Sequence, residues 1–235
     1  MWPIPTLEHD LITISFLPHN LVLCWMTGNT KHNNKLTVNA YERHELNNLE
    51  LAHLVIFNPT RVKQIIHKFL STHKKENAFI TVSLNGLGVS EQFITMPTST
   101  PKTSEFKIEH SSNLLWGYRF MYQNDNGEFV FYLYKIPRSL LLQYELLAIA
   151  SKLNLINITT QNMALLNTYK TIFGSAFRHS QLAIDMMRHN NSIESLISTD
   201  ILKKIISTSS TINLAHELPY LATVCGLFND QGLRL

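Results

Sequence analysis

A glycine-punctuated segment in the first half of the chain is the closest match to a phosphate-binding loop. In AFITVSLNGLGVSEQFITMP, residues 78–97, Gly86 and Gly88 follow a run of β-formers. A phosphate loop needs backbone amides that converge at a helix N-terminus, usually after a longer glycine signature or before Lys and Ser or Thr. NGLGVSEQ lacks these features, and β-compatible residues resume at Phe93. We therefore interpret NGLG as a turn.

Metal and nucleophile chemistry have equally little support in the sequence. The chain has 11 histidines, but no two of them stand at i, i+4 on an expected helix with a carboxylate between them. The segment GSAF contains a serine but lacks the GxSxG spacing of a nucleophile elbow. We expect no metal site, no cofactor and no catalytic residue, so the chain is not expected to be an enzyme.

The composition is that of a globular chain with a weakly charged surface. Hydrophobic residues make up 45% and charged residues 16% of the 235 residues, and the formal net charge is +3. This length can bury a sizeable core, whereas the charge is too small to indicate nucleic-acid binding. The N-terminus lacks the basic segment of a signal peptide. The most apolar stretch, 140–153, is too short to cross ~30 Å of hydrocarbon. We expect a cytoplasmic protein with no membrane insertion.

The first half is expected to form a meander, a helix and a further strand. Three β-compatible runs separated by turn-forming residues come first, at 11–17, 21–27 and 35–43. Asn58 is a suitable N-cap, and Pro59 suits the first helical position. One apolar face then repeats at helical spacing and consists of Val62, Ile65, Ile66, Phe69 and Leu70. The alternating run 79–84 is the expected strand.

The second half begins with a polar linker that marks a change of unit. This linker, MPTSTPKTSEF, contains two prolines. The runs 114–123 and 128–136 are joined by NDNG, which indicates a hairpin because Asn, Asp and Gly accept positive φ. The elements expected after the hairpin are a helix at 139–153, a strand at 155–160, helices at 161–173, 200–206 and 218–228, and a loop at 207–211.

This order of elements resembles the PilM family of type IV pilus assembly proteins, including its shorter HofM-like members. That family is related to actin and to the division protein FtsA. FITVSLNGLGVSEQFITMP is similar to the family's strand before its inserted subdomain. The residues from GYRFMYQNDNGEF to LINITT are similar to the insertion and the return strand, and YLATVCGLF is similar to the closing helix. The resemblance covers most of residues 11–173.

Three positions depart from the pattern of family members that bind nucleotide. Those members carry an Asp, a phosphate turn with small residues and a basic residue on the first two strands. The corresponding positions here hold Ser15, Leu17 and Val22. Without the carboxylate a magnesium ion loses an anchor, and a Cβ in place of glycine crowds the approach of a phosphate to the backbone. The resemblance therefore implies a chain that does not use ATP.

We predict an α+β fold with an actin-like (RNase H-like) core lobe. This lobe contains the three-strand meander and is predicted to comprise residues 1–97 and 154–174. Residues 98–153 are predicted to form an inserted hairpin-plus-helix subdomain. Residues 175–235 are predicted to form a reduced, helical C-terminal part, because about 60 residues are too few for a full second lobe.

The function that the resemblance implies is that of a non-catalytic scaffold in a type IV pilus or related secretion machine. The chain would lie at the cytoplasmic side of the inner membrane and bind the cytoplasmic tail of an inner-membrane partner. A groove between core lobe and insertion would hold this tail by strand-like hydrogen bonds and apolar pockets. The predicted partner-binding residues are Phe93, Met96, Tyr132 and Tyr134, for which cross-strand packing is the alternative role. Self-association is left open.

Two other functions are left open by the sequence. One is an actin-like ATPase with an atypical nucleotide site, which would bind a fluorescent ATP analogue in the presence of magnesium. The other is an RNase H-like module that binds nucleic acid, since that fold shares the strand order. Nucleases of that kind need clustered carboxylates, and the early strands supply none.

Overall fold

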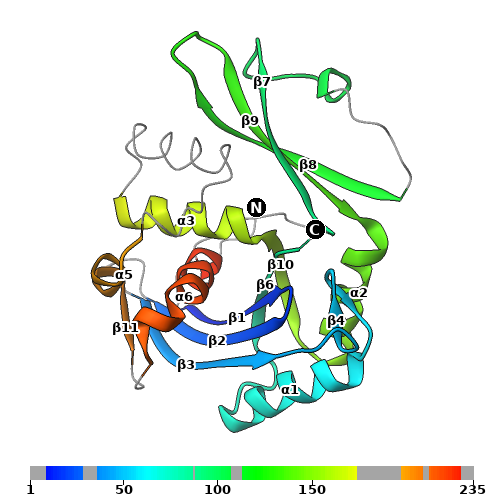
Figure 1. The fold of residues 1–235 in the computed structure, drawn as a ribbon, viewed down its shortest axis with the longest axis vertical. Coiled ribbons are helices and arrows are strands. Elements are labelled where there is room, and N and C mark those ends of the chain that lie inside the picture. The colour runs from blue at the N-terminus through cyan, green and yellow to red at the C-terminus, as the bar shows by residue number, and fades with distance from the viewer. Residues whose placement is uncertain are drawn as a thin grey trace.

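The computed structural model describes residues 9–28, 36–86, 88–106, 113–173, 197–208 and 212–228. These residues form two main sheets (Figure 1). One is a six-stranded sheet with helices on both faces, and the other is a three-stranded sheet that stands beside it. A small hairpin of two short strands, β4 (Leu51–Ala52) and β5 (Val55–Ile56), lies next to the first sheet.

The six-stranded sheet contains the predicted meander. Its strands, in order across the sheet, are β10 (Asn154–Thr160), β6 (Phe79–Leu84), β1 (His9–Leu17), β2 (Asn20–Gly28), β3 (Leu36–Glu45) and β11 (Ile206–Thr208). β1, β2 and β3 pair antiparallel, so the meander is confirmed. β6 runs parallel to β1, and β10 runs parallel to β6. The carboxyl ends of these three strands therefore meet at one edge, where sheets of this kind bind ligands.

One face of this sheet is covered by α1 (Pro59–Thr72) and α2 (Arg138–Ala150). α1 begins where predicted, because the Asn58 side-chain oxygen accepts a hydrogen bond from the Arg61 backbone nitrogen at 3.0 Å. The residues that α1 buries are those of the predicted apolar face, Val62, Ile65, Ile66, Phe69 and Leu70. They pack against the apolar residues of β1 that point to this face, which are Ile12, Ile14 and Phe16. This face is an ordinary aliphatic and aromatic core.

The opposite face carries small polar side chains in the middle of the sheet. Alternation along the strands places six of them there, all buried: Thr13, Ser15, Thr81, Ser83, Asn157 and Thr159. Three helices cover this face: α3 (Gln161–Phe173), α5 (Thr199–Ile205) and α6 (Leu214–Phe228). α6 lies across β1, β6 and β2 and packs along α3. Small side chains beneath α6 let it approach the sheet closely.

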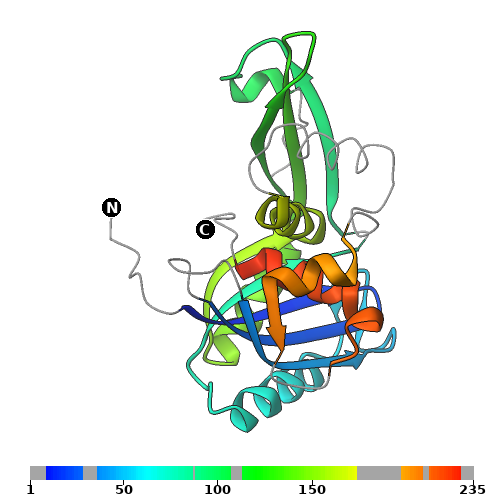
Figure 2. The ribbon, with the colours of Figure 1, turned by 90° about the vertical axis from the view of Figure 1, so that its left-hand side faces the viewer.

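The three-stranded sheet consists of β7 (Ser90–Met96), β9 (Phe129–Pro137) and β8 (Leu114–Gln123), with β9 in the middle. β8 and β9 form the hairpin predicted from NDNG, in which Gly127 adopts φ +80°. β7, which falls within the range 1–97 of the predicted core lobe, pairs with β9 and not with the six-stranded sheet. Figure 2 shows that this sheet projects away from the rest of the molecule.

The C-terminal residues add to the first sheet and its helical cover. A loop is expected at 207–211, but residues 206–208 form β11, which pairs parallel with β3. That expectation is wrong because three residues carry too little periodicity to reveal a strand. α6 begins at Leu214, earlier than the predicted 218. Within the predicted C-terminal part 175–235, residues 175–196, 209–211 and 229–235 lie outside the described residues. The domain boundaries stay predictions.

Gly226 of α6 faces α3 at very close range. A Cβ at this position would overlap the carbonyl group of Ala164 and would lie 2.8 Å from Thr168 Oγ1. The Thr168 hydroxyl in turn donates a hydrogen bond to the carbonyl oxygen of Ala222. The backbones of the two helices thus meet without side chains between them at this point.

Replacement of Gly226 by alanine tests this contact, because the contact and helix propensity predict changes of opposite sign in the free energy of unfolding. Intrinsic helix propensity alone predicts that Gly226→Ala stabilises α6 by about 1 kcal/mol. Overlap with the Ala164 carbonyl predicts the opposite, a loss of about 1–3 kcal/mol in the free energy of unfolding. We expect the loss, measured by urea unfolding of both proteins. A more stable variant would contradict the close contact between α3 and α6.

Candidate functional site

The four predicted partner-binding residues do not share one face of the three-stranded sheet. Phe93 on β7 pairs directly with Tyr132 on β9, and their ring centroids lie 5.3 Å apart. Tyr134 lies beside Tyr132 on the same face, with a centroid separation of 6.1 Å. Met96 is three residues from Phe93, so strand alternation turns it to the other face, where it packs with Phe106 and other apolar residues. The structure therefore brings together three of the four.

The four residues also differ in how far their side chains are buried. Tyr132 is fully buried and Met96 nearly so, and each belongs to an apolar cluster. Phe93 and Tyr134 are only partly buried. The Tyr134 ring lies across β8, because a Cβ at Gly117 would overlap its hydroxyl group. Tyr132 and Met96 thus contribute to the packing of the sheet, and a role of all four residues in partner binding stays a prediction.

A chain of hydrogen bonds joins this face of the three-stranded sheet to the core. The Met163 backbone nitrogen donates to Thr160 Oγ1 at 3.3 Å, and Thr160 Oγ1 lies 2.8 Å from the Tyr132 hydroxyl. The Tyr132 hydroxyl donates to one carboxylate oxygen of Glu91. Asn162 donates to the other at 2.7 Å. The carboxylate therefore links β7 and β9 to the end of β10 and the first turn of α3.

Glu91 is the only residue of this junction whose charge responds to pH in the acidic range. Burial raises the pKa of its carboxyl group, while hydrogen bonds from Thr160 and Asn162 act to lower it, and the net shift is upward. Both carboxylate oxygens have donors within the protein. The group is thus engaged in holding the junction.

The three positions that were compared above with nucleotide-binding members of the PilM family hold residues that belong to the core. Ser15 pairs with Ser83 across β1 and β6, and their hydroxyl oxygens lie 2.6 Å apart in the buried interior. Leu17 and Val22 are buried in the cluster beneath the helices. The three side chains that depart from the nucleotide-binding pattern are therefore packed or bonded within the sheet.

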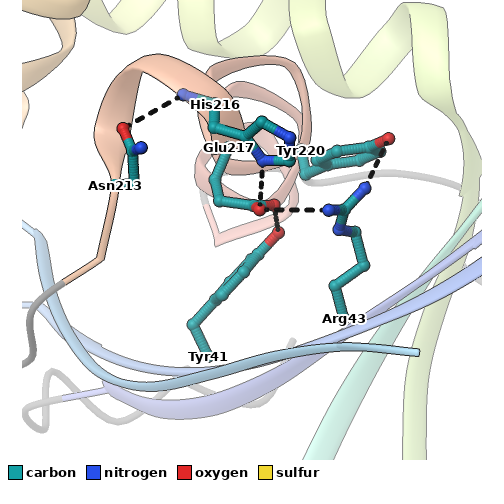
Figure 3. A network of polar contacts seen from close by, with 6 residues as sticks. All are labelled: Tyr41, Arg43, Asn213, His216, Glu217 and Tyr220. Atoms are coloured by element: carbon teal, nitrogen blue, oxygen red, sulfur yellow. Dashed lines mark hydrogen bonds and ion pairs between the residues drawn. The ribbon is translucent and has the colours of Figure 1, made fainter. Parts of the chain in front are cut away.

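A second polar network connects α6 to strand β3 of the six-stranded sheet (Figure 3). The Tyr41 hydroxyl donates to Glu217 Oε2 at 2.5 Å, and Arg43 Nη2 lies 3.4 Å from Glu217 Oε1. His216 Nδ1 lies 2.8 Å from the same oxygen. Arg43 also donates to the Tyr220 hydroxyl at 3.4 Å and lies over the Tyr220 ring, 5.1 Å from its centroid.

The electrostatics of this network favour an ionised carboxylate. Partial burial acts to raise the pKa of Glu217, but hydrogen bonds from Tyr41 and His216 and the charge of Arg43 outweigh it, so the pKa is lowered. Burial and the bond to Glu217 raise the pKa of Tyr41. Because its oxygens are occupied by three donor groups, we interpret the carboxylate as a structural anchor for α6.

Neither network was recognised from the sequence, although a weak signal existed for one of them. Glu91 shares its strand parity with Phe93 and Thr95, so a carboxylate on the inward face of β7 could have been noticed. Tyr41 and Glu217 are separated by 176 positions, and no local pattern relates them. Among the described residues, no cluster of three or more His, Cys, Asp or Glu side chains is suited to hold a metal ion.

The strand order, the helices on both faces and the projecting sheet define an α+β protein with an actin-like core, as predicted. Comparison with solved structures agrees. A chain of the PilM–PilN type IV pilus biogenesis complex superposes with a TM-score of 0.61 at 11% sequence identity, over 95% of this chain and 98% of that chain. At this low identity, the likeness establishes the fold.

Two further solved structures match part of this chain with lower TM-scores. The cytoplasmic domain of EpsL, an inner-membrane component of the type II secretion system of Vibrio cholerae, matches 66% of this chain and 57% of its own, with 7% identity and a TM-score of 0.43. A Bacteroides thetaiotaomicron protein with an actin-like ATPase fold and unknown function matches 74% of this chain and 61% of its own, with 14% identity and a TM-score of 0.35.

The sequence itself matches no protein-family model and no curated protein. In the described part of the chain, no helix combines the length and the apolar character that a membrane crossing requires.

Glu91 predicts an unusual dependence of stability on pH. Because its pKa is raised in the folded protein, the folded state takes up a proton more readily than the unfolded state. Relative to Glu91→Gln, the wild-type chain should therefore gain stability as the pH falls from about 7 to about 4.5. Urea unfolding of both proteins across this range measures the difference. A constant difference would show that the carboxylate is solvated and not part of the junction.

Glu217 predicts the opposite trend. Its pKa is lowered by folding, so its stabilisation is complete above the unfolded pKa and is lost as the pH falls below about 4.5. Glu217→Gln should cost about 1–3 kcal/mol at pH 7, since charge-assisted hydrogen bonds to Tyr41 and Arg43 are lost. The difference between the two unfolding free energies should therefore narrow as the pH falls below about 4.5. A gap that stays open would mean that shape, and not charge, fixes α6.

Proposed function

We propose that this chain is a non-catalytic scaffold of a type IV pilus or related secretion machine, and that it binds the cytoplasmic tail of an inner-membrane protein. The observation that carries the proposal is the likeness to a chain of the PilM–PilN complex, which extends over nearly the whole length of both chains. In this proposal the partner holds the chain at the cytoplasmic side of the inner membrane.

The contacts at the carboxyl ends of the strands support a role without ATP. Ser15 stands where nucleotide-binding relatives have an acid, and its hydroxyl is bonded to Ser83. A neutral hydroxyl offers magnesium a much weaker ligand than a carboxylate does. Leu17 and Val22 are packed beneath the helices, so a phosphate that approached this turn would meet aliphatic side chains.

The junction of the two sheets supports the proposed tail site. Among the described residues, β7 pairs with β9 alone, so its outer edge suits the addition of an extended peptide strand. Phe93 of β7 and the neighbouring Tyr134 keep partly exposed rings on the face that looks toward the core. The Glu91 network fixes this face against α3. A bound tail would pair with β7 and pack its apolar side chains against these rings.

Site-directed photo-crosslinking in cells tests this proposal. A benzoylphenylalanine at position 93 should form a covalent product with the cytoplasmic segment of an inner-membrane protein, identified by mass spectrometry. The matched control is position 120, since Phe120 lies on the other face of the same sheet and is 48% exposed. We expect the product at 93 and not at 120.

Two outcomes would overturn the proposal. A product at 93 that maps only to soluble proteins, or to the periplasmic part of a membrane protein, would contradict the tail site. Saturable micromolar binding of a fluorescent ATP analogue to the purified chain with magnesium would contradict the non-catalytic role and favour the ATPase.

A further inference from the structure

The helix α2 carries large apolar side chains on both of its faces. Its buried face consists of Leu140, Leu141, Tyr144, Leu147 and Ala148. On the outward face, Leu142, Leu146 and Ile149 are 50%, 55% and 71% exposed. Spacings of four and three residues align these three side chains along one line of the helix. A helix at a protein surface normally places polar residues there, so this stripe has the pattern of a helix that is covered on both sides.

The β4–β5 hairpin, which is bonded to α2, carries two further exposed apolar side chains. Gln143 accepts a hydrogen bond from the Ile56 backbone nitrogen and donates one to the Leu54 carbonyl oxygen, each at 2.9 Å. These bonds hold the hairpin beside α2, and Figure 1 shows the two at the edge of the molecule. Ile56 is buried, whereas its neighbours Val55 and Phe57 are 41% and 61% exposed. We call these residues, Val55, Phe57, Leu142, Leu146 and Ile149, the α2–β5 surface.

The size and charge of the α2–β5 surface limit what can cover it. Five half-exposed large side chains present roughly 500 Å², close to the largest apolar patch of a typical monomer. A stable interface between two protein copies buries about 800 Å² on each partner. Glu145 flanks the centre of the stripe, so a two-fold arrangement of two α2 helices would bring two Glu145 carboxylates together. Area and charge therefore both disfavour a second copy of this chain.

We infer that the α2–β5 surface binds a short amphipathic helix of a partner protein. The stripe from Leu142 to Ile149 is about 10 Å long, which matches two turns of helix. The partner helix would present apolar side chains at i, i+3 or i+4, and i+7, and a Lys or Arg opposite Glu145. This surface lies on α2 and β5, apart from Phe93 and β7, so the inference does not depend on the proposed tail site.

A displayed library of 15-residue helical peptides tests the inference with the full chain as target. Leucine is fixed at i, i+3 and i+7, and the flanking positions are random. Selection on the wild-type chain should enrich Lys or Arg at one flanking position, and selection on Glu145→Lys should enrich Asp or Glu there. Leu146→Glu should weaken a selected peptide about tenfold or more in fluorescence anisotropy, as expected of a central anchor. Phe120→Glu is the control, since Phe120 is 48% exposed on β8 and is not part of this surface.

Three results would overturn the inference. The first is enrichment that is the same on wild type and on Leu146→Glu, once thermal unfolding has shown that the variant folds. The second is the absence of any saturable peptide. The third is a concentration-dependent dimer of the chain alone in sedimentation velocity that Leu146→Glu abolishes, which would assign the surface to a second copy.

Discussion

The close approach of α6 to the six-stranded sheet is the constraint on which the rest of the fold depends. Thr13, Ser15, Thr81 and Ser83 leave room beneath this helix, because their side chains are small. Gly226 lets α6 touch the α3 backbone. Large aliphatic residues at these strand positions would hold α6 farther from the sheet, and the Glu217 carboxylate would then not reach Tyr41 and Arg43. The small polar residues beneath α6 therefore have a packing role.

The two polar networks differ in what they hold. Glu217 connects helix α6 to strand β3, and the hydrogen-bond donors around it favour its ionised form. Glu91 ties the projecting sheet to the start of α3, and burial disfavours its charge. A carboxylate that is costly to bury is retained where the angle between two substructures must be fixed, because hydrogen bonds are directional while apolar contacts are not. The junction at Glu91 thus gives the proposed tail site a defined geometry.

Local patterns in the sequence predicted most helices and strands. They did not predict which strands pair when the strands are distant in the sequence. The apolar face of α1 and the NDNG hairpin follow from spacing and turn chemistry within a few residues. The membership of β7 in the second sheet depends on pairing with β9 across an intervening segment, and β11 depends on β3. The odd spacing between Phe93 and Met96 already places these two residues on opposite faces of β7. The anchors at Glu91 and Glu217 require contacts between distant residues, which composition and periodicity do not encode.

An actin-like ATPase uses nucleotide to bridge two lobes, so its conformation depends on its ligand. In this chain the carboxyl end of β1 is packed by contacts of the protein itself, which are the Ser15–Ser83 bond, the packed Leu17 and the α6 helix above them. A fold held by internal contacts presents its surfaces in one arrangement, and a preorganised surface binds with a smaller loss of conformational entropy. Under the proposed function, a packed core at this position suits the chain to hold its partner-binding surfaces in place. The apolar side chains that are exposed on α2 and at the sheet junction are the positions at which partners are proposed to bind.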